Sequence, residues 1–197
     1  ELRFLAWDNQ TLVYNLLFAC ASSTLKDFGL NPKNLGADIG MTAVLHTHNR
    51  RLDYHPHVHV VVPGGGVDKA KKQWKKKGAK YLFNEFALAR VFRARFLEAC
   101  TKAGLSLPTA VPRNWVVDCT YAGKGLSALK YLSRYLYRGV IGEKSIVFNQ
   151  DGKITFQYVE GRTGETLHRT MEGHDFVWLA LQHVLPKSFR RVRDNGF

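Results

Sequence analysis

Apolar residues recur along the chain at two spacings, and each spacing predicts one type of secondary structure. Between residues 5 and 28 the spacing is roughly helical, with apolar side chains at Leu5, Leu12, Leu16, Ala19 and Leu25. Gly29 and Pro32 follow and predict the end of this helix. A second helix is expected after Asn84, because an asparagine side chain can cap the first turn of a helix.

Short runs rich in valine and threonine predict strands. Residues 41–49 form one such run and residues 57–62 form another, so we expect a hairpin with a polar loop of several residues between them. The clearest hairpin is expected within residues 145–159, where an Asp-Gly pair stands at the turn. Residues 114–121 predict a further strand.

In the remaining segments, the positions of glycine, proline and charged residues predict the secondary structure. Residues 69–80 are dominated by lysine and predict a loop, and a helix is expected between Gly125 and Gly139. Residues 174–185 predict a last helix, and a basic tail closes the chain. Because helices and strands alternate in mixed order, we expect an α+β fold with a central, largely antiparallel sheet flanked by helices.

The charge balance predicts a polyanionic partner. The chain has 197 residues, 45% of them hydrophobic, which suffices for one sizeable core, so residues 1–197 are expected to form a single domain. Lys and Arg number 29 against 16 Asp and Glu, and a net charge of +13 is typical of nucleic-acid-binding proteins. We find no transmembrane run, signal peptide or long basic amphipathic helix, so no membrane partner is expected. Three distant cysteines indicate a reducing cytoplasm rather than a disulfide framework.

Histidines alternate along the second strand of the first hairpin. His55, His57 and His59 point to one face of the strand, while the intervening valines point to a core. Two imidazoles at i and i+2, about 7 Å apart along the strand, can converge on one metal ion. The preceding strand supplies His46 and His48, which also share a face, so a cluster of three histidines on two paired strands is expected.

Two other interpretations of this histidine cluster remain open. Any single histidine could lie on a solvated strand face, but five of the eight histidines fall between residues 46 and 59, and this clustering favours a metal site. A zinc hydrolase is the rival kind of metal site, because imidazole suits zinc. The nearby acids Asp53 and Asp68 lie in predicted loops, so neither is an obvious catalytic base.

Two tyrosines share one face of the helix predicted between residues 125 and 139. Tyr131 and Tyr135 are four residues apart and therefore one turn apart. Basic side chains surround the pair, namely Lys124, Lys130, Arg134 and Arg138. Packing against the sheet is one role for such tyrosines. The neighbouring cations favour a second role as nucleophiles, because a phenol of ordinary pKa about 10 needs help to react at neutral pH.

Three blocks of the sequence resemble one enzyme family. His57-Val58-His59 resembles the signature of the HUH endonuclease superfamily, whose members nick single-stranded DNA through a tyrosine on a helix. The longer resemblance is to rolling-circle transposases of the "ninety-one" insertion-sequence family. It is carried by LHTHNRRLDYHPHVHVVVPGGG (residues 45–66), YLSRYLYRG (residues 131–139) and HVLPKSFRRVRDNGF (residues 183–197), in the order of the family.

The resemblance implies specific roles for these residues. Tyr131 and Tyr135 correspond to the paired nucleophiles of the family, and His57 and His59 to its metal-binding histidines. Relaxase relatives have a third histidine about eleven positions earlier, which corresponds to His46, with His48 as the alternative and His55 at the end of the hairpin. The implied cofactor is Mg²⁺ or Mn²⁺, and the implied chemistry is transesterification through a 5′-phosphotyrosine bond.

The substrate implied by the resemblance is single-stranded DNA, at transposon ends and at the target. Basic side chains would follow its backbone and an aromatic side chain could stack on its bases. The candidates for DNA contact are Lys71, Lys72, Trp74, Lys75, Lys76, Lys124, Arg134, Arg138, Arg190, Arg191 and Arg193. Simple solvation is the alternative role for these charges. The expected location is the cytoplasm, at the nucleoid in a bacterium, and the sequence does not predict an oligomeric state.

Two alternative functions remain open at this stage. A rolling-circle replication initiator or relaxase-type nicking enzyme would have the same site, although the block at residues 183–197 favours a transposase. The other alternative is a non-catalytic domain that binds single-stranded nucleic acid and whose histidines hold structural metal. Members of the family usually also carry a cysteine-rich, zinc-binding N-terminal region, and its absence here predicts that the sequence is a catalytic fragment of a longer or processed protein.

Overall fold

A computed structural model describes most of the chain, in residues 2–78, 82–123, 126–127, 130, 133, 139–161 and 163–196. The helix predicted between Gly125 and Gly139 falls largely in the gaps, although its four described residues are helical. Tyr131 and Tyr135 lie outside the described residues, as do three basic DNA-contact candidates, namely Lys124, Arg134 and Arg138.

The central sheet is built on the predicted hairpin. Strands β1 (Met41–His48) and β2 (Tyr54–Val61) pair antiparallel, and β8 (Val192–Asn195) pairs with the other edge of β1. The hairpin is therefore confirmed, whereas β8 lies in the segment expected to be only a basic tail. The Thr42 hydroxyl donates a hydrogen bond of 2.6 Å to Asp194, which fixes this late strand against β1.

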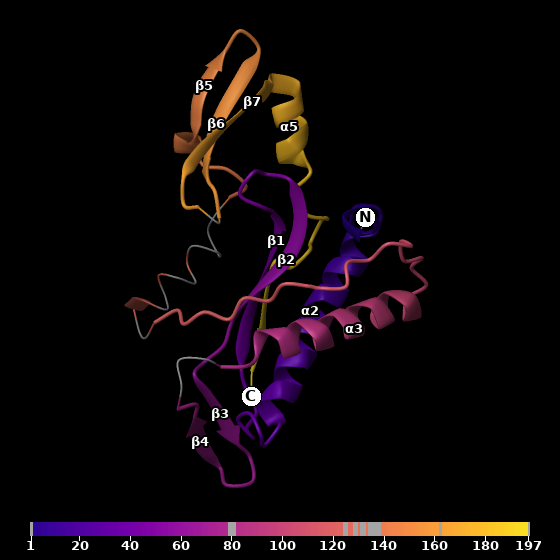
Figure 1. The fold of residues 1–197 in the computed structure, drawn as a ribbon, viewed down its shortest axis with the longest axis vertical. Helices are drawn as coiled ribbons and strands as arrows, with labels where there is room; N and C mark the ends of the chain where they lie inside the picture. Colours follow the sequence, from indigo (N-terminus) through magenta and orange to yellow (C-terminus); the bar gives the residue numbers. More distant parts are fainter. Residues whose placement is uncertain are drawn as a thin grey trace.

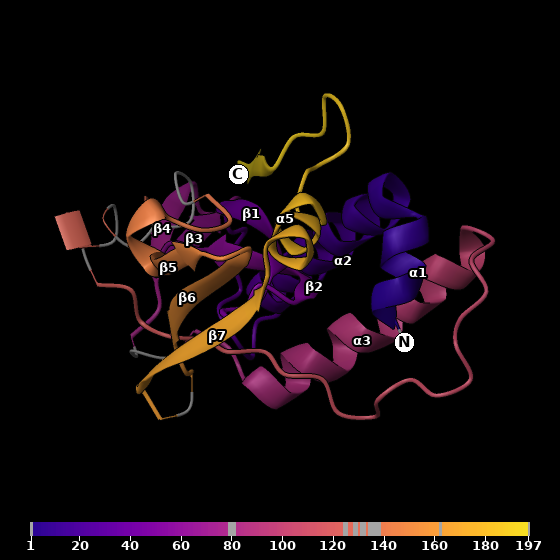
Figure 2. The ribbon, with the colours of Figure 1, turned by 90° about the horizontal axis from the view of Figure 1, so that it is seen from above.

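Helices cover one side of the β1–β2 hairpin. Figures 1 and 2 place α2 (Gln10–Leu30) beside the hairpin and α3 (Glu85–Lys102) next to α2, with α1 (Leu2–Asp8) before them. The single helix predicted over residues 5–28 is thus two helices. They separate at Asn9, whose backbone leaves the helical region and whose side-chain amide donates to the Leu5 carbonyl. The Asn84 cap of α3 is confirmed by its hydrogen bond to the Ala87 amide.

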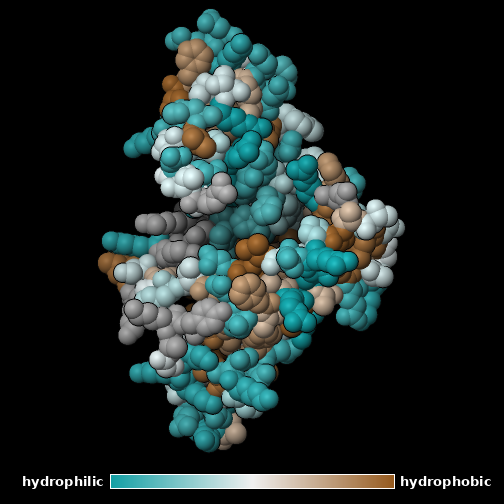
Figure 3. Space-filling view, viewed as in Figure 1, coloured by the Kyte–Doolittle hydropathy of each residue, from teal (hydrophilic) through white to brown (hydrophobic). Residues whose placement is uncertain are grey.

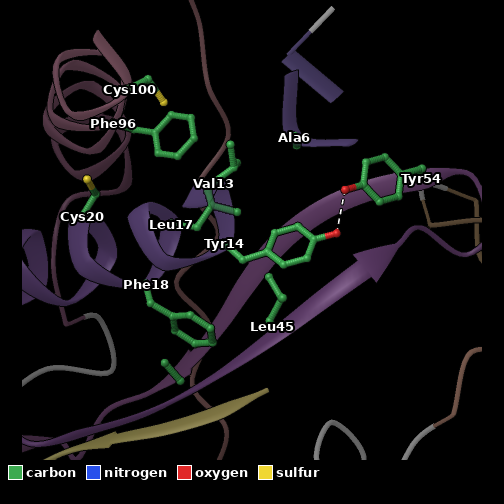
Figure 4. Close-up of a cluster of buried hydrophobic side chains, with 11 residues drawn as sticks. Ala6, Val13, Tyr14, Leu17, Phe18, Cys20, Leu45, Tyr54, Phe96 and Cys100 are labelled. Atoms are coloured by element: carbon green, nitrogen blue, oxygen red, sulfur yellow. Dashed lines mark hydrogen bonds between the residues drawn. The ribbon is translucent and has the colours of Figure 1, made fainter. Parts of the chain in front are cut away.

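The main core lies between these helices and the hairpin. Val13, Leu17 and Phe18 of α2 pack with Ala43 and Leu45 of β1, and α3 adds Phe96 and Cys100. Val58 and Val60 also pack against this core, as the strand alternation predicted. Figure 4 shows the one polar contact of this cluster, a 2.6 Å hydrogen bond between the hydroxyls of Tyr14 and Tyr54. This bond joins α2 to the start of β2.

The lysine-rich segment after β2 is a two-stranded ribbon rather than the predicted loop. Strands β3 (Gly65–Asp68) and β4 (Gln73–Lys76) pair antiparallel and project at one end of the molecule (Figure 1). Two glycines explain the ribbon. A Cβ at Gly66 would lie 2.3 Å from the Asp38 carbonyl oxygen, and one at Gly65 would lie 2.8 Å from the Trp74 ring. Glycine therefore lets β3 pack closely on both neighbours.

A third sheet occupies the opposite end of the molecule (Figure 1). It has the order β5-β6-β7, with β5 (Ile146–Gln150), β6 (Lys153–Val159) and β7 (Thr166–Glu172) all antiparallel. The predicted β5–β6 hairpin is confirmed, and the left-handed backbone of Asp151 and Gly152 makes its turn. Strand β7 was not predicted. A short helix, η1 (Glu143–Ser145), precedes β5, and α5 (Gly173–Leu181) follows β7 and ends before the predicted residue 185.

The strand predicted at residues 114–121 is wrong. This segment has no regular secondary structure, although Trp115 and Val117 of its apolar residues pack on the core. Trp115 packs on Phe92 and Phe96, and the Cys119 amide donates a 2.7 Å hydrogen bond to Glu85 of α3. An alternating apolar pattern therefore anchors an extended chain on α3 here, without a strand beside it among the described residues.

The fold class is α+β with antiparallel sheets, as expected. The two ends of the molecule, which carry β3–β4 and β5–β7, are predominantly hydrophilic (Figure 3), and the face between the upper end and the middle is hollowed. Among the helices that the structure describes, none combines the length and apolarity needed to cross a bilayer.

Candidate metal centre

Three histidines converge on the face of the hairpin opposite the helices. His46 of β1 is directly paired with His57 of β2, so both side chains point to the same face. His59 lies two residues further along β2 on that face. One ring nitrogen from each of His46, His57 and His59 lies within 4.8 Å of the other two. The Nε2 atoms of His57 and His59 are 3.1 Å apart.

A backbone contact orients the His57 ring toward this cluster. Its Nδ1 atom lies 2.7 Å from the His55 carbonyl oxygen. A carbonyl oxygen only accepts hydrogen bonds, so Nδ1 must carry the proton, and Nε2 is left with a free lone pair in the neutral ring. A metal-binding histidine is usually held in this way by its other nitrogen. The donor set therefore fits a metal ion.

Burial keeps the imidazoles of His57 and His59 neutral. Removal from water, together with the nearby rings of His57 and His46, lowers the pKa of His59 to about 3. Burial also lowers the pKa of His57. His46 is itself buried. Neutral rings are the form that binds metals, so at neutral pH no proton has to be removed from His57 or His59 before binding.

His48 and His55 lie beside the cluster but outside it. The His48 ring is stacked on the His46 ring at 5.9 Å and lies 5.1 Å from the ring of His183. His55 is exposed and contributes its carbonyl to His57. Of the two candidates for a third ligand, His46 is the one whose ring nitrogen lies with those of His57 and His59.

His183 is a residue that sequence reasoning missed. It is buried, and its Nε2 atom lies 2.8 Å from the Leu52 carbonyl oxygen, so it fastens the loop between β1 and β2. Its ring also lies 6.3 Å from that of Tyr54. Burial lowers the pKa of His183, and the hydrogen bond to the Leu52 carbonyl raises it by less. Its inclusion in the block at residues 183–197 was the only signal in the sequence.

Some of the C-terminal arginines make intramolecular contacts that stabilise the fold. The Arg193 guanidinium lies 4.2 Å from the centre of the Phe18 ring and is hydrogen-bonded to Asn15. The Nε atom of Arg191 donates to the Leu45 carbonyl at 3.2 Å. Arg190 is exposed. Two of the three arginines therefore hold β8 against the core, and their contact with DNA stays a prediction.

The lysine candidates lie on the β3–β4 ribbon. The side chains of Lys71, Lys72, Lys75 and Lys76 are exposed, and the Trp74 ring between them is 45% exposed. Lys69 at the turn instead forms an ion pair of 2.6 Å with Asp38. The ribbon therefore presents cations and one aromatic ring together, which is the combination expected of a surface that binds single-stranded nucleic acid.

Comparisons with known proteins show the family to which the chain belongs. Residues 40–197 match a protein family described as "Putative transposase", and this span contains the histidine cluster and both tyrosines. The curated protein "Putative transposase y4qJ" of Sinorhizobium fredii (strain NBRC 101917 / NGR234) is 35% identical, over 98% of this chain and 54% of its own length.

A second curated relative is "Transposase for insertion sequence element IS801" of Pseudomonas savastanoi pv. phaseolicola. It is 28% identical, over 84% of this chain and 44% of its own length. The chain thus spans about half the length of the curated relatives it matches. No solved structure matches the chain.

Proposed function

Because the chain belongs to the transposase family that its residues 40–197 match, we propose that it nicks and joins single-stranded DNA during rolling-circle transposition. Residues 1–197 would act together as the catalytic domain. The observation that carries the proposal is the convergence of His46, His57 and His59, whose ring nitrogens lie within 4.8 Å of one another on paired strands. Its substrates would be the strands at the transposon ends and at the target, in the cytoplasm at the nucleoid.

The reaction is a transesterification at a DNA phosphodiester. A phenol oxygen of Tyr131 or Tyr135 forms a bond to phosphorus, and the bond from phosphorus to the 3′ oxygen breaks. The freed 3′ oxygen takes up a proton, which balances the one that the phenol loses. The resulting 5′-phosphotyrosine bond keeps the energy of the phosphodiester, so rejoining needs no ATP. A second tyrosine allows a second strand to be cut while the first stays attached.

The three histidines supply the site for a divalent cation. Bound there, Mg²⁺ or Mn²⁺ would polarise an oxygen of the scissile phosphate. Imidazole donors suit Mn²⁺ better than Mg²⁺, which prefers oxygen ligands, so we expect Mn²⁺ to activate more strongly. The contribution of His55 is to hold the His57 ring with Nε2 facing the cluster.

The test is a covalent adduct between protein and DNA. The protein is incubated with Mn²⁺ and an end-labelled single-stranded oligonucleotide library, and the attached peptide and base are mapped. We expect adducts at Tyr131 or Tyr135, and their loss in the double variant Tyr131→Phe/Tyr135→Phe with binding retained. Tyr121→Phe, at an exposed tyrosine outside the site, is the matched control. Failure of the unmutated protein to form any adduct would favour the non-catalytic binding domain.

The rival enzyme function is a rolling-circle replication initiator or relaxase. Its chemistry at the histidines and tyrosines would be the same, so the adduct assay does not separate the two. The match to a transposase family supports transposition. Joining of the cleaved strand to an unrelated target strand, rather than only back to itself, is the outcome that separates the transposase from the initiator.

A further inference from the structure

A cavity lined by aromatic rings lies where α1 and α5 meet the start of β2. It has a volume of about 300 Å³ and lies outside the histidine cluster. Its aromatic walls are Phe4, Trp7, Tyr54 and Trp178, and Arg3 and Gln182 add polar groups. We call these six residues the aromatic pocket. A cavity of this size is at the small end of the range for ligand sites, so it suits one ring system and not a helix.

The walls of the aromatic pocket are arranged in two layers. Trp7 is fixed edge-on against Tyr54, with ring centres 5.3 Å apart, and the Tyr54 hydroxyl is anchored by Tyr14. Trp178 of α5 lies 6.2 Å from Trp7 and is 60% exposed, and Phe4 is 61% exposed. A rigid inner wall and exposed outer rings leave flat apolar surface available for stacking.

The hydrogen-bonding groups at the pocket favour a nucleobase over a phosphate. Asp53 also lines the cavity, and its carboxylate accepts hydrogen bonds from Arg169 at 2.8 Å and Asn49 at 3.1 Å. Ion pairs with Arg169 and Arg51 balance the charge of this carboxylate, so its oxygens act as hydrogen-bond acceptors, which suit the N–H donors of a base and not a phosphate. The Arg3 guanidinium instead lies over the Phe4 ring, 5.1 Å from its centre, at the outer wall. A nucleobase inside with its phosphate outside matches this distribution.

The pocket is close to the histidine cluster along one strand. Tyr54 and His57 are three residues apart on β2, which is roughly 10 Å at the rise of a strand. They point to opposite faces, so a DNA strand joining the two would pass over the loop between β1 and β2. Arg50 and Arg51 are exposed on that loop and would lie along its path.

We propose that the aromatic pocket binds one unstacked base of the single-stranded DNA, a few nucleotides from the phosphodiester that is cut. The proposal rests on the proposed function for its substrate. Stacking against Trp178 and Phe4 would supply affinity, and the Gln182 amide and Asp53 carboxylate would offer hydrogen bonds to the edge of the base. The pocket would thus hold the strand in place while a phosphate further along it lies at the histidines.

The test combines Trp178→Ala with an abasic scan. Binding of a single-stranded oligonucleotide is measured by fluorescence anisotropy, with the base removed at each position in turn. We expect one position at which base removal weakens binding to the unmutated protein by about 5- to 150-fold, the range that corresponds to about 1–3 kcal/mol of stacking. Trp178→Ala should weaken binding equally and abolish the effect of base removal at that position.

Controls separate this proposal from the function on which it rests. Phe86→Ala removes an aromatic ring that is 81% exposed on α3 and should change nothing. If the unmutated protein forms the tyrosine adduct but Trp178→Ala binds DNA as tightly as the unmutated protein, the pocket proposal is overturned and the proposed nicking function stands. Base-dependent binding through Trp178 without any adduct supports the pocket and overturns the nicking function. A change of oligomeric state in Trp178→Ala, with DNA binding unaltered, would identify a protein contact and overturn the proposal.

Discussion

The Nε2 atoms of His57 and His59 face each other at 3.1 Å. Because the Nδ1 proton of His57 is committed to the His55 carbonyl, His57 accepts in this hydrogen bond and His59 donates. A cation bound at the same place would replace one hydrogen bond by two coordinate bonds, and the His59 ring would need only to move its proton from Nε2 to Nδ1. The two rings are therefore already positioned for a shared metal ion.

The histidine cluster predicts which residue supplies the third ligand. His46→Ala, His57→Ala and His59→Ala should each weaken Mn²⁺ binding at least about tenfold, since each removes one donor. His48→Ala should weaken it less, because its ring nitrogens do not belong to the convergent set. Binding is measured by calorimetry and by the electron paramagnetic resonance of Mn²⁺.

His174→Ala is the control for the metal titration, because that side chain is exposed on α5 and distant in sequence from the cluster. Equal losses in His46→Ala and His174→Ala would contradict the assignment. A larger loss in His48→Ala than in His46→Ala would make His48 the third ligand.

The buried hydroxyl pair of Tyr14 and Tyr54 predicts a stability effect. Tyr14→Phe leaves the Tyr54 hydroxyl buried without this partner, and should cost about 1–3 kcal/mol in the free energy of unfolding. The double variant Tyr14→Phe/Tyr54→Phe should cost less than the sum of the single changes. Urea denaturation measures all three, and additive losses would indicate that the bond contributes nothing.

The same pair predicts how stability depends on pH. Burial raises the pKa of the Tyr54 phenol above its ordinary value of 10.0, and the hydrogen bond with Tyr14 raises it further. The unfolded chain then releases its protons first, so stability is fully present below pH 10 and falls as the pH rises above it. Denaturation curves above pH 10 should show a shallower fall for Tyr54→Phe than for the unmutated protein.

Strand periodicity explains why the convergence of the three histidines could be predicted. His46, His57 and His59 share a face because side chains alternate along a strand, and a hairpin register places His46 opposite His57. The position of His183 could not be predicted, because its contact with Leu52 joins residues 131 positions apart. The aromatic pocket likewise depends on how α1 and α5 pack, which no local pattern encodes.

Two errors in the predicted elements have a common cause. Residues 114–121 alternate as a strand does, but no strand edge lies beside them among the described residues, and Trp115 packs on α3 instead. Residues 69–80 are rich in lysine, which suggested a loop. A ribbon forms there because its backbone pairs with β3, and exposed strands tolerate charge on both faces. Pairing partners, rather than local composition, decided both outcomes.

The close packing around Gly66 predicts that a larger residue at this position destabilises the fold. A Cβ at this position would lie 2.3 Å from the Asp38 carbonyl oxygen, so Gly66→Ala must push β3 away from residues 37 and 38. We expect a loss of about 1–3 kcal/mol in the free energy of unfolding, as for other overpacked sites. Gly64→Ala is the matched control, since a Cβ there meets nothing within 4 Å. Thermal unfolding that is equal in the two variants would contradict the close packing.

The lysines of the β3–β4 ribbon predict the salt dependence of DNA binding. Each phosphate contact with single-stranded DNA contributes about 0.7 to the slope of log affinity against log salt, through release of counterions. The triple variant Lys71→Ala/Lys72→Ala/Lys76→Ala should therefore lower that slope by about 2 if all three side chains touch phosphates. Lys102→Ala/Lys144→Ala/Lys153→Ala removes the same charge from α3, η1 and β6 and is the matched control. Anisotropy titrations at several salt concentrations measure both, and equal slopes in the two triple variants would mean that the ribbon lysines serve only solvation.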